Sequence, residues 1–329
     1  MKDTYILGIE SSCDETSVAI VKNGRDILSN VINSQIKIHQ EYGGVVPEIA
    51  SRCHIEVINQ ITKQALNEAK LRLNDIDAIA VTYGPGLVGA LLVGVSYAKG
   101  LSFATDKPLI AVNHIAGHIA GNYLTYPELK PPFLCLIISG GHTNLVNVKN
   151  YYEYDIIGKT RDDAIGEAFD KVARVVGLGY PGGPKIDEMA KNGNPNIELP
   201  KVNLDNLDFS FSGIKTAVIN LNHKNPNINK QDLCISFEKS VTEMLIKNVE
   251  EAVKIYDFDK VVLAGGVSRN SYIRNEFDKM SKRLNVNVFY PEPILCTDNA
   301  AMIAAQGYYD FIAGKRSDLY LNAIPNLKL

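Results

Sequence analysis

Two histidines four residues apart, His114 and His118, have the residue type and spacing of a metal site. They follow a predicted strand at 108–112 and open a predicted helix, where an i, i+4 spacing puts both imidazoles on one face. Two neutral imidazoles suit Zn(II) or Fe(II) when a third ligand comes from elsewhere and one position stays open. Two buried histidines at a helix start are the simpler alternative for an arbitrary HxxxH pattern.

An internal repeat points to a candidate third ligand. Residues 7–20 and 134–147 each predict a strand, a turn of small residues and a second strand. Residues 76–86 and 258–268 each predict a buried strand that ends in a glycine turn, preceded by an amphipathic helix. The sequence therefore predicts two copies of one α/β unit. They flank an extra segment at about 151–230, which we place at the mouth of a cleft between two lobes.

Asp298 occupies in the second copy the place that the histidine pair occupies in the first. It follows the predicted strand 286–290 and precedes a helix that begins at Asn299. A two-lobed molecule with a pseudodyad would bring both helix starts together across the cleft, where His, His and Asp make an open metal site. N-capping by Thr297 or Asp298 is the alternative explanation for an Asp at this position.

Glycine-bearing segments could hold a nucleotide. The Ser-Gly-Gly-His-Thr turn at 139–143 presents backbone N–H groups that can bind phosphate oxygens, although an ordinary hairpin turn has the same pattern. At 265–270, two glycines after a buried strand let a planar ring lie on the backbone. Asn270 can bond that ring or a ribose, or simply cap a helix. Residues 163–170 and 180–187 add carboxylates and glycines suited to ribose hydroxyls.

A metallopeptidase is disfavoured. The zinc peptidase signature needs a Glu after the first His as general base, and Ile115 stands at that position here.

The composition is that of a folded protein of enzyme size. The chain has 329 residues, 46% of them hydrophobic and 22% charged. At about 100 to 200 residues per domain, this length predicts two domains or one large two-lobed unit. A net charge of -3 gives no global basic field, so a polyanion would need a local patch or a partner. Five cysteines without CxxC spacing argue against disulfides and zinc ribbons. No export signal is expected, and Gly84-Pro85-Gly86 breaks the apolar segment 78–98, so we expect a cytoplasmic protein without a membrane span.

Nine motifs follow one another along nearly the whole chain. They are GIESSCDET at 8–16, GPGLVGALLVG at 84–94, NHIAGH at 113–118, SGGHT at 139–143, GEAFDKVAR at 166–174, YPGGPKID at 180–187, FSFSGIKTA at 209–217, GGVSRN at 265–270 and TDNAAMIA at 297–304. Together they resemble the tRNA adenosine threonylcarbamoyltransferase family of the bacterial TsaD type, whose members older descriptions call O-sialoglycoprotein endopeptidases.

The resemblance implies a fold and a reaction. The fold is α/β, a duplicated actin-like ATPase fold as in sugar kinases and heat-shock ATPases. One lobe would comprise 1–130, with a C-terminal helix at 300–329 packed back on it, and the other 131–299. The reaction is transfer of a threonylcarbamoyl group from threonylcarbamoyl-AMP to the N6 amine of the adenosine 3′ of the anticodon, in tRNAs that read codons starting with A, with release of AMP.

The resemblance also implies site residues and partners. The metal ligands would be His114, His118 and Asp298, holding one Fe(II) or Zn(II) per chain. Archaeal relatives carry a further ligand, a Tyr, where this chain has Ile137, so water or the donor must complete the coordination. A TsaB-like paralogue and a TsaE-like ATPase would join tRNA as partners, and Mg/ATP or AMP could also enter the cleft. The donor would bind to Ile137, Ile138, Ser139, Gly140, Gly141, Asp170, Gly183, Asp187 and Asn270.

Carboxylates near the first turn are candidates for proton transfer. Asp14, and after it Glu15, could take the proton of the amine or orient the substrate, whereas turn formation is the structural alternative. An actin-fold kinase or ATPase, with Asp14 on Mg²⁺, and a catalytically silent binding subunit are the competing functions. A kinase has no use for two imidazoles, and a silent homologue would have lost them.

A local basic rim could hold the anticodon stem. Its residues would lie in or near the segment at the cleft mouth, although pairing with Glu167, Asp170 and Asp187 inside the protein is the alternative, with a partner subunit then supplying most tRNA contacts. The rim residues are Arg161, Lys171, Arg174, Lys185 and Lys215.

Overall fold

A computed structural model describes residues 2–201, 204 and 206–329, which form two compact units. The first unit comprises Met1–Pro131, Asn150–Glu153 and Pro291–Leu329, and the second comprises Pro132–Lys149 and Tyr154–Tyr290. The segment 291–299, which we expected in the second lobe, therefore belongs to the first. Asp298 therefore lies in the first unit.

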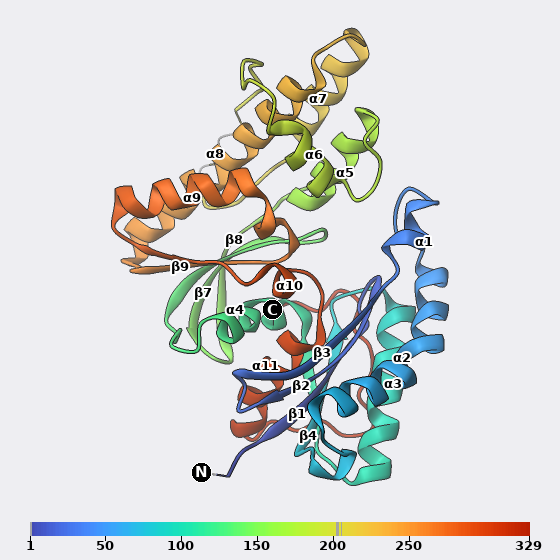
Figure 1. Cartoon of the computed structure of the whole chain (residues 1–329). Helices are drawn as coiled ribbons and strands as arrows, with labels where there is room; N and C mark the ends of the chain where they lie inside the picture. Colours follow the sequence, from blue (N-terminus) through green and yellow to red (C-terminus); the bar gives the residue numbers. More distant parts are fainter. Residues whose placement is uncertain (1, 202–203, 205) are drawn as a thin grey trace. The chain divides into compact units, whose positions relative to one another are not determined.

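The first unit is built on a mixed five-stranded sheet in the order β3-β2-β1-β4-β5 (Figure 1). The central strand β1 pairs antiparallel with β2 and parallel with β4, and β4 pairs parallel with β5. The carboxyl ends of three neighbouring parallel strands thus share one edge of the sheet. The strands are β1 (Tyr5–Glu10), β2 (Glu15–Lys22), β3 (Asp26–Ser34), β4 (Ala78–Gly84) and β5 (Leu109–Asn113).

Helices cover both faces of this sheet, because alternate residues of each strand face opposite ways. Leu7 and Ile9 lie in one hydrophobic cluster with residues of α2 and α3, whereas Ile6 lies in another with residues of α11. Gly8 lets α11 approach closely, since an added Cβ there would lie 2.8 Å from the Ala304 nitrogen. The helices are α1 (Ile36–Gln40), α2 (Pro47–Ala69), α3 (Val88–Thr105), α4 (His114–Thr125), α10 (Pro293–Cys296) and α11 (Ala300–Ile312), with a 3₁₀ turn at Leu73–Asp75.

The C-terminal helix is shorter than expected. We expected helix throughout 300–329, but α11 ends at Ile312 and Gly314 adopts a left-handed φ of 82° just beyond it. The remaining chain returns without helix to the β4–α3 turn, where Ile324 donates to the Tyr83 carbonyl and Gly86 donates to the Pro325 carbonyl. The tail is thus held by backbone hydrogen bonds to the first unit.

The second unit repeats the sheet of the first, as the internal repeat predicts. Its order is β10-β9-β6-β7-β8, and β6 pairs antiparallel with β7 and parallel with β9, just as β1 does with β2 and β4. The strands are β6 (Phe133–Ile138), β7 (Thr143–Asn150), β8 (Glu153–Lys159), β9 (Lys260–Ala264) and β10 (Asn287–Phe289). The helices are α5 (Ile165–Val175), α6 (Gly182–Ala190), α7 (Ser212–Lys224), α8 (Lys230–Tyr256) and α9 (Ser271–Leu284), with a 3₁₀ turn at Gly266–Arg269.

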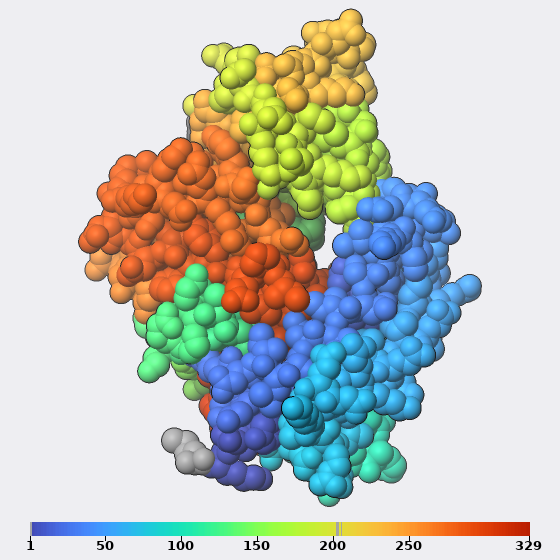
Figure 2. Space-filling view, in the orientation of Figure 1, coloured from blue at the N-terminus to red at the C-terminus, as the bar shows by residue number. Residues whose placement is uncertain are grey.

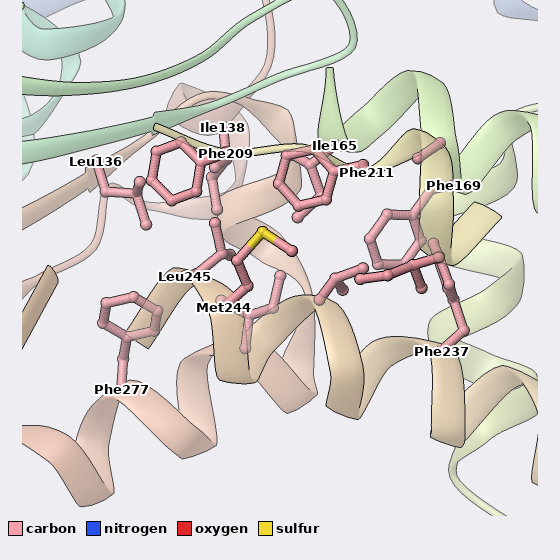
Figure 3. Packing of buried hydrophobic residues seen from close by; sticks show 14 of the residues in the cluster. Leu136, Ile138, Ile165, Phe169, Phe209, Phe211, Phe237, Met244, Leu245 and Phe277 are labelled. Atoms are coloured by element: carbon pink, nitrogen blue, oxygen red, sulfur yellow. The ribbon is translucent and has the colours of Figure 1, made fainter. Parts of the chain in front are cut away.

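The extra segment at about 151–230 is integrated into the second unit. Its helices α5, α6 and α7 form the yellow-green to yellow end of that unit (Figure 2). Figure 3 shows why they are fixed there: Phe169 of α5 meets Phe237 of α8 edge to face at 5.0 Å, and Phe209 and Phe211 join the same buried cluster. The segment therefore shares one hydrophobic core with the second sheet.

The apolar segment 78–98 is a strand, a turn and a helix, as predicted. By length and composition alone α3 could cross a membrane, which is weak evidence because core helices pass the same test. Its buried side, which includes Leu91 and Val95, packs toward β4 and α2.

Candidate functional site

The histidine pair opens helix α4, as the sequence predicts. The Asn113 side chain caps the helix by accepting hydrogen bonds from the N–H groups of Ile115 at 2.8 Å and Ala116 at 3.3 Å. His114 is the first helical residue and His118 lies one turn later. Both are buried, and their rings meet edge to face with centroids 4.7 Å apart.

Asp298 points its carboxylate at this pair. Its Oδ1 lies 3.5 Å from His114 Nε2 and 3.2 Å from His118 Nε2. Helix α11 is capped instead by Asn299, whose side chain accepts from the Met302 N–H, so N-capping does not explain Asp298. One ligand atom from each of the three residues lies within 4.8 Å of the other two, which is the arrangement a metal site needs.

The three residues belong to one unit, which corrects the expectation that two lobes contribute to the cluster. After β10 the chain crosses into the first unit and packs α10 beside α4: the Glu292 N–H donates to Thr125 Oγ1 at 3.0 Å, and Leu295 is buried. Helices α4 and α11 then lie side by side (Figure 1). The cluster is therefore built by packing within the first unit.

The surroundings of the histidines fit a cation. In the described part of the chain His118 Nδ1 has no hydrogen-bond partner, and Nε2 faces the Asp298 carboxylate at 3.2 Å without forming a hydrogen bond, although the residue is 1% exposed. A buried polar group left unpaired is costly, and a metal ion would satisfy it. Burial lowers the pKa of His114, but the Asp298 and Glu10 carboxylates outweigh burial and raise that pKa to about 9. The same negative charge favours a divalent cation, and two nitrogens with one oxygen suit Zn(II) or Fe(II).

Glu10 is a buried neighbour of this cluster that sequence reasoning missed. Its Oε2 lies 3.1 Å from His114 Nδ1 and accepts a hydrogen bond from Thr82 Oγ1 at 2.6 Å. Burial opposes its ionisation, but the charge and the hydrogen bond of His114 keep the pKa of Glu10 lowered. The sequence signal that could have indicated Glu10 is a single carboxylate at the end of an otherwise apolar strand. Burial of a carboxylate without a partner costs free energy, so a partner is expected.

Asp14 lies in the turn between β1 and β2 and Glu15 is the first residue of β2; both are buried. Ser34 Oγ donates to Glu15 Oε1 at 3.0 Å. Burial, with the charges of Asp14 and Asp298, raises the pKa of Glu15 far above its usual range. A carboxyl group that retains its proton is a poor base, so Asp14 remains the better candidate of the two.

The phosphate-turn candidates lie at the carboxyl end of β6 in the second unit. Ile137 and Ile138 are fully buried, and the turn after them closes when the Ser139 N–H donates to the His142 carbonyl at 2.9 Å. Added Cβ atoms at Gly140 and Gly141 would meet nothing within 4 Å, so the turn has open space beside its backbone.

Two further glycines bring other segments to this turn. Gly166 allows α5 to begin beside it, since an added Cβ would lie 2.7 Å from Gly140 Cα. Gly265, at a φ of 89°, packs on the Ile138 carbonyl. The structure therefore brings together the glycine turns that follow β6 and β9.

The remaining donor candidates form bonds that join helices of the second unit. Asp170 accepts from the Gly182 N–H, the residue next to Gly183, at 2.6 Å. Asp187 accepts from both the N–H and the hydroxyl of Ser271. Asn270 caps α9 and donates to a buried Glu238 at 2.6 Å, and burial raises the pKa of that glutamate to about 8. The capping alternative for Asn270 is thus realised.

The expected basic rim is largely paired with acids. Lys171 contacts Asp163 at 2.8 Å and Glu167 at 2.7 Å, and Lys215 bonds the other oxygen of Asp163. Arg161 pairs with Asp208 at 2.9 Å, Lys185 Nζ donates to the Leu178 carbonyl, and Arg174 is exposed in the last turn of α5. Glu167 is one of the three acidic residues with which we expected the basic residues to pair if they do not bind tRNA. These ion pairs argue against a rim of basic side chains that lack acidic partners.

Comparisons with a family model and with named relatives point to the same family over most or all of the chain. A family model described as "TsaD: tRNA N6-adenosine threonylcarbamoyltransferase" matches residues 26–305. A relative of that name from Clostridium novyi (strain NT) is 59% identical over 100% of this chain and 98% of its own length. One from Clostridium botulinum (strain Hall) is 58% identical over 100% of this chain and 99% of its own length.

Solved structures show the fold. Full-length HypF in its phosphate- and nucleotide-bound form has a TM-score of 0.65 at 16% identity, over 95% of this chain and 56% of that one. Component A of the Acidaminococcus fermentans (R)-2-hydroxyglutaryl-CoA dehydratase has a TM-score of 0.57 at 15% identity, over 95% and 100%. The α/β, duplicated actin-like ATPase fold is thereby confirmed.

We predict that His114→Ala or Asp298→Ala abolishes high-affinity zinc binding, because each removes a ligand. Asp298→Ala should change the melting temperature little, whereas His114→Ala also removes a partner of the buried Glu10 and should lower it. Zinc is measured by elemental analysis after gel filtration, and the exposed His223→Ala serves as the matched control. The wild type and the control should hold about one equivalent each. Retention of a full equivalent by both ligand variants would show that the cluster is not the binding site.

Proposed function

The chain belongs to the tRNA N6-adenosine threonylcarbamoyltransferase family, and from that premise we propose the full reaction that it catalyses. The threonylcarbamoyl group passes from threonylcarbamoyl-AMP to the N6 amine of the adenosine 3′ of the anticodon, in tRNAs that read codons starting with A. The observation that carries the proposal is the similarity to named transferases at 56–59% identity over the whole chain. The His114, His118 and Asp298 cluster supports it with a site for a metal.

The chemistry balances as an acyl transfer. The amine nitrogen forms a bond to the carbamoyl carbon, the bond from that carbon to the phosphate oxygen breaks, and AMP leaves with the electron pair. The amine loses one proton, which a base must accept. The amine is a weak nucleophile because its lone pair is delocalised into the adenine ring, so activation and orientation of the donor matter most.

We assign the residues of the second unit to the donor. The backbone N–H groups of Gly140 and Gly141 would bind the phosphate, because these residues leave the backbone open to an oxygen. Asp170, Asp187 and Asn270 hold the starts of α6 and α9 by hydrogen bonds, and we assign them to the nucleoside part of the donor. The same N–H groups would stabilise negative charge on the leaving phosphate.

We assign the residues of the first unit to the metal and to proton transfer. His114, His118 and Asp298 would hold one Zn(II) or Fe(II), which when bound supplies Lewis-acid polarisation of an oxygen. Asp14 would accept the amine proton. Glu15, whose raised pKa keeps it protonated, would serve as a hydrogen-bond donor rather than as the base.

The partners are also part of the proposal. We infer that tRNA is held jointly by this chain and by a TsaB-like paralogue and a TsaE-like ATPase, because Lys171, Lys215 and Arg161 are paired with acids and the net charge is -3. A cytoplasmic location follows from such partners. A kinase or ATPase of the same fold is disfavoured by the two imidazoles, since Mg²⁺ prefers oxygen ligands.

The test is single-turnover transfer in the reconstituted assembly, from donor labelled in its threonyl group. Label should enter a transcribed tRNA that reads a codon starting with A, and none should enter the same tRNA with guanosine in place of the adenosine 3′ of the anticodon. Asp14→Asn should lower the rate about 10²- to 10⁴-fold through loss of the base. Glu15→Gln should stay near the wild-type rate, because an amide resembles a protonated carboxyl group.

Equal label in both tRNAs would contradict the acceptor assignment. A wild-type rate in Asp14→Asn would exclude Asp14 as the base while leaving the reaction itself intact. Phosphate release from ATP by this chain alone, without transfer, would favour the kinase or ATPase.

A second prediction concerns the phosphate turn. Gly140→Val should weaken AMP binding roughly 5- to 150-fold, because a side chain there blocks approach to the backbone and leaves donors unpaired at about 1–3 kcal/mol each. Gly100→Val, in α3 at another position where an added Cβ meets nothing within 4 Å, is the control and should bind AMP normally. Calorimetry that finds equal affinities in the two variants would place the phosphate elsewhere.

A further inference from the structure

We propose that Glu10 is a positioning residue for the metal centre: it holds His114 in the tautomer whose Nε2 faces His118 and Asp298. This inference rests on one part of the proposed function, the assignment of His114, His118 and Asp298 to a metal. Glu10 acts through His114, since no ligand atom of the cluster belongs to it.

Glu10 is fully buried at the end of β1, where it follows the buried apolar residues 6–9. A carboxylate in such a place is stable only when hydrogen bonds replace its water. Three donors surround it. The Ser12 N–H donates to Oε1 at 2.5 Å, Thr82 Oγ1 donates to Oε2 at 2.6 Å, and His114 Nδ1 lies 3.1 Å from the same Oε2. Such an array fixes the orientation of the carboxylate.

The sheet topology explains why these groups meet. Strands β1, β4 and β5 are parallel neighbours, so their carboxyl ends share one edge. Glu10 is the last residue of β1, Thr82 lies near the end of β4, and His114 follows the last residue of β5. The Glu10 carboxylate therefore reaches from the end of β1 to the helix start that carries the ligand His114.

The contact determines which nitrogen of His114 is available. A neutral imidazole carries one proton, and a carboxylate beside Nδ1 keeps the proton there, which leaves the Nε2 lone pair for a metal. Ser12 Oγ also lies 3.1 Å from Nδ1, but a charged acceptor bonds an N–H more strongly than a hydroxyl does. The Nε2 atom lies 3.5 Å from Asp298 Oδ1, on the side where the ligand atoms converge.

The two histidines differ in this respect. Within the residues that the structure describes, His118 Nδ1 has no hydrogen-bond partner, so no acceptor there selects its tautomer. Loss of Glu10 should consequently weaken the metal site through His114 alone. That gives the inference a measurable consequence separate from folding.

The test compares zinc affinity, by competition with a chelator, in the full chain and three variants. Glu10→Gln keeps the size of the side chain but cannot accept all three hydrogen bonds, and should weaken zinc binding roughly 10- to 100-fold. Thr82→Val leaves the carboxylate but removes the hydroxyl that orients it, and should weaken binding less. Thr62→Val, which removes a buried hydroxyl bonded to the Ile58 carbonyl in α2, is the control and should bind as the wild type does.

A spectroscopic readout separates positioning from a general loss of structure. In zinc-loaded protein with ¹⁵N-labelled histidine, the His114 Nδ1 proton should resonate far downfield and exchange slowly in the wild type and in Thr62→Val. It should move upfield and exchange faster in Glu10→Gln. Unchanged affinity and an unchanged proton signal in both Glu10→Gln and Thr82→Val would overturn the inference, as would an equal loss of affinity in Thr62→Val.

Failure of the proposed function gives a different result. A wild-type chain that binds zinc but transfers nothing in the reconstituted assembly would refute the reaction and leave the role of Glu10 standing. A wild-type chain that binds no zinc would overturn the role of Glu10.

Discussion

The account depends on the packing of α11 against α4, which sets one carboxylate opposite two imidazoles in a buried place. Two glycines let α11 pack closely on its neighbours: Gly8 admits it to the sheet, and Gly117 admits it to α4, where an added Cβ would lie 2.6 Å from Ile303 Cδ1. A core of this density resists small shifts, so Asp298 is held at 3.2 Å and 3.5 Å from the two Nε2 atoms. The chemistry that we assign to the first unit follows from that placement.

Duplication gives the two units the same sheet but different chemistry at its carboxyl edge. In the first unit the edge carries Glu10, which contacts His114, and the histidine pair, which with Asp298 forms a cluster that could hold a metal ion. In the second unit the edge ends in glycine turns. Gly140 leaves its backbone open, whereas Gly265 packs closely on the Ile138 carbonyl. The same topology therefore presents charged side chains in one unit and open backbone in the other. This agrees with the general rule that the residues of a site, and not the fold, determine function.

Sequence reasoning succeeded where the signal was local or repeated. The histidine spacing, the helix start at 114 and the repeat that singles out Asp298 are properties of short segments, and the structure brings these three residues together. It failed where the outcome depends on tertiary packing. The pseudodyad argument placed Asp298 in the other lobe, because the repeat does not show that the chain crosses back at Pro291.

Long-range contacts account for the other misses. Glu10 lay unnoticed because its partners Thr82 and His114 are 72 and 104 residues away in the chain. The ion pairs that Asp163 and Asp208 form with residues of the expected basic rim also depend on side-chain orientation, which residue spacing cannot show. The protonated state of Glu15 likewise depends on burial and on Asp298, which is 283 residues away.

The central claim is that the first unit holds a metal through two imidazoles and a carboxylate. X-ray absorption at the zinc edge of the loaded protein tests it most directly, because multiple scattering from imidazole rings is distinctive. The account predicts two imidazole nitrogens at about 2.0–2.1 Å with oxygen in the remaining positions, and loss of one imidazole in His118→Ala. A spectrum with sulfur ligands or without imidazole scattering would contradict it.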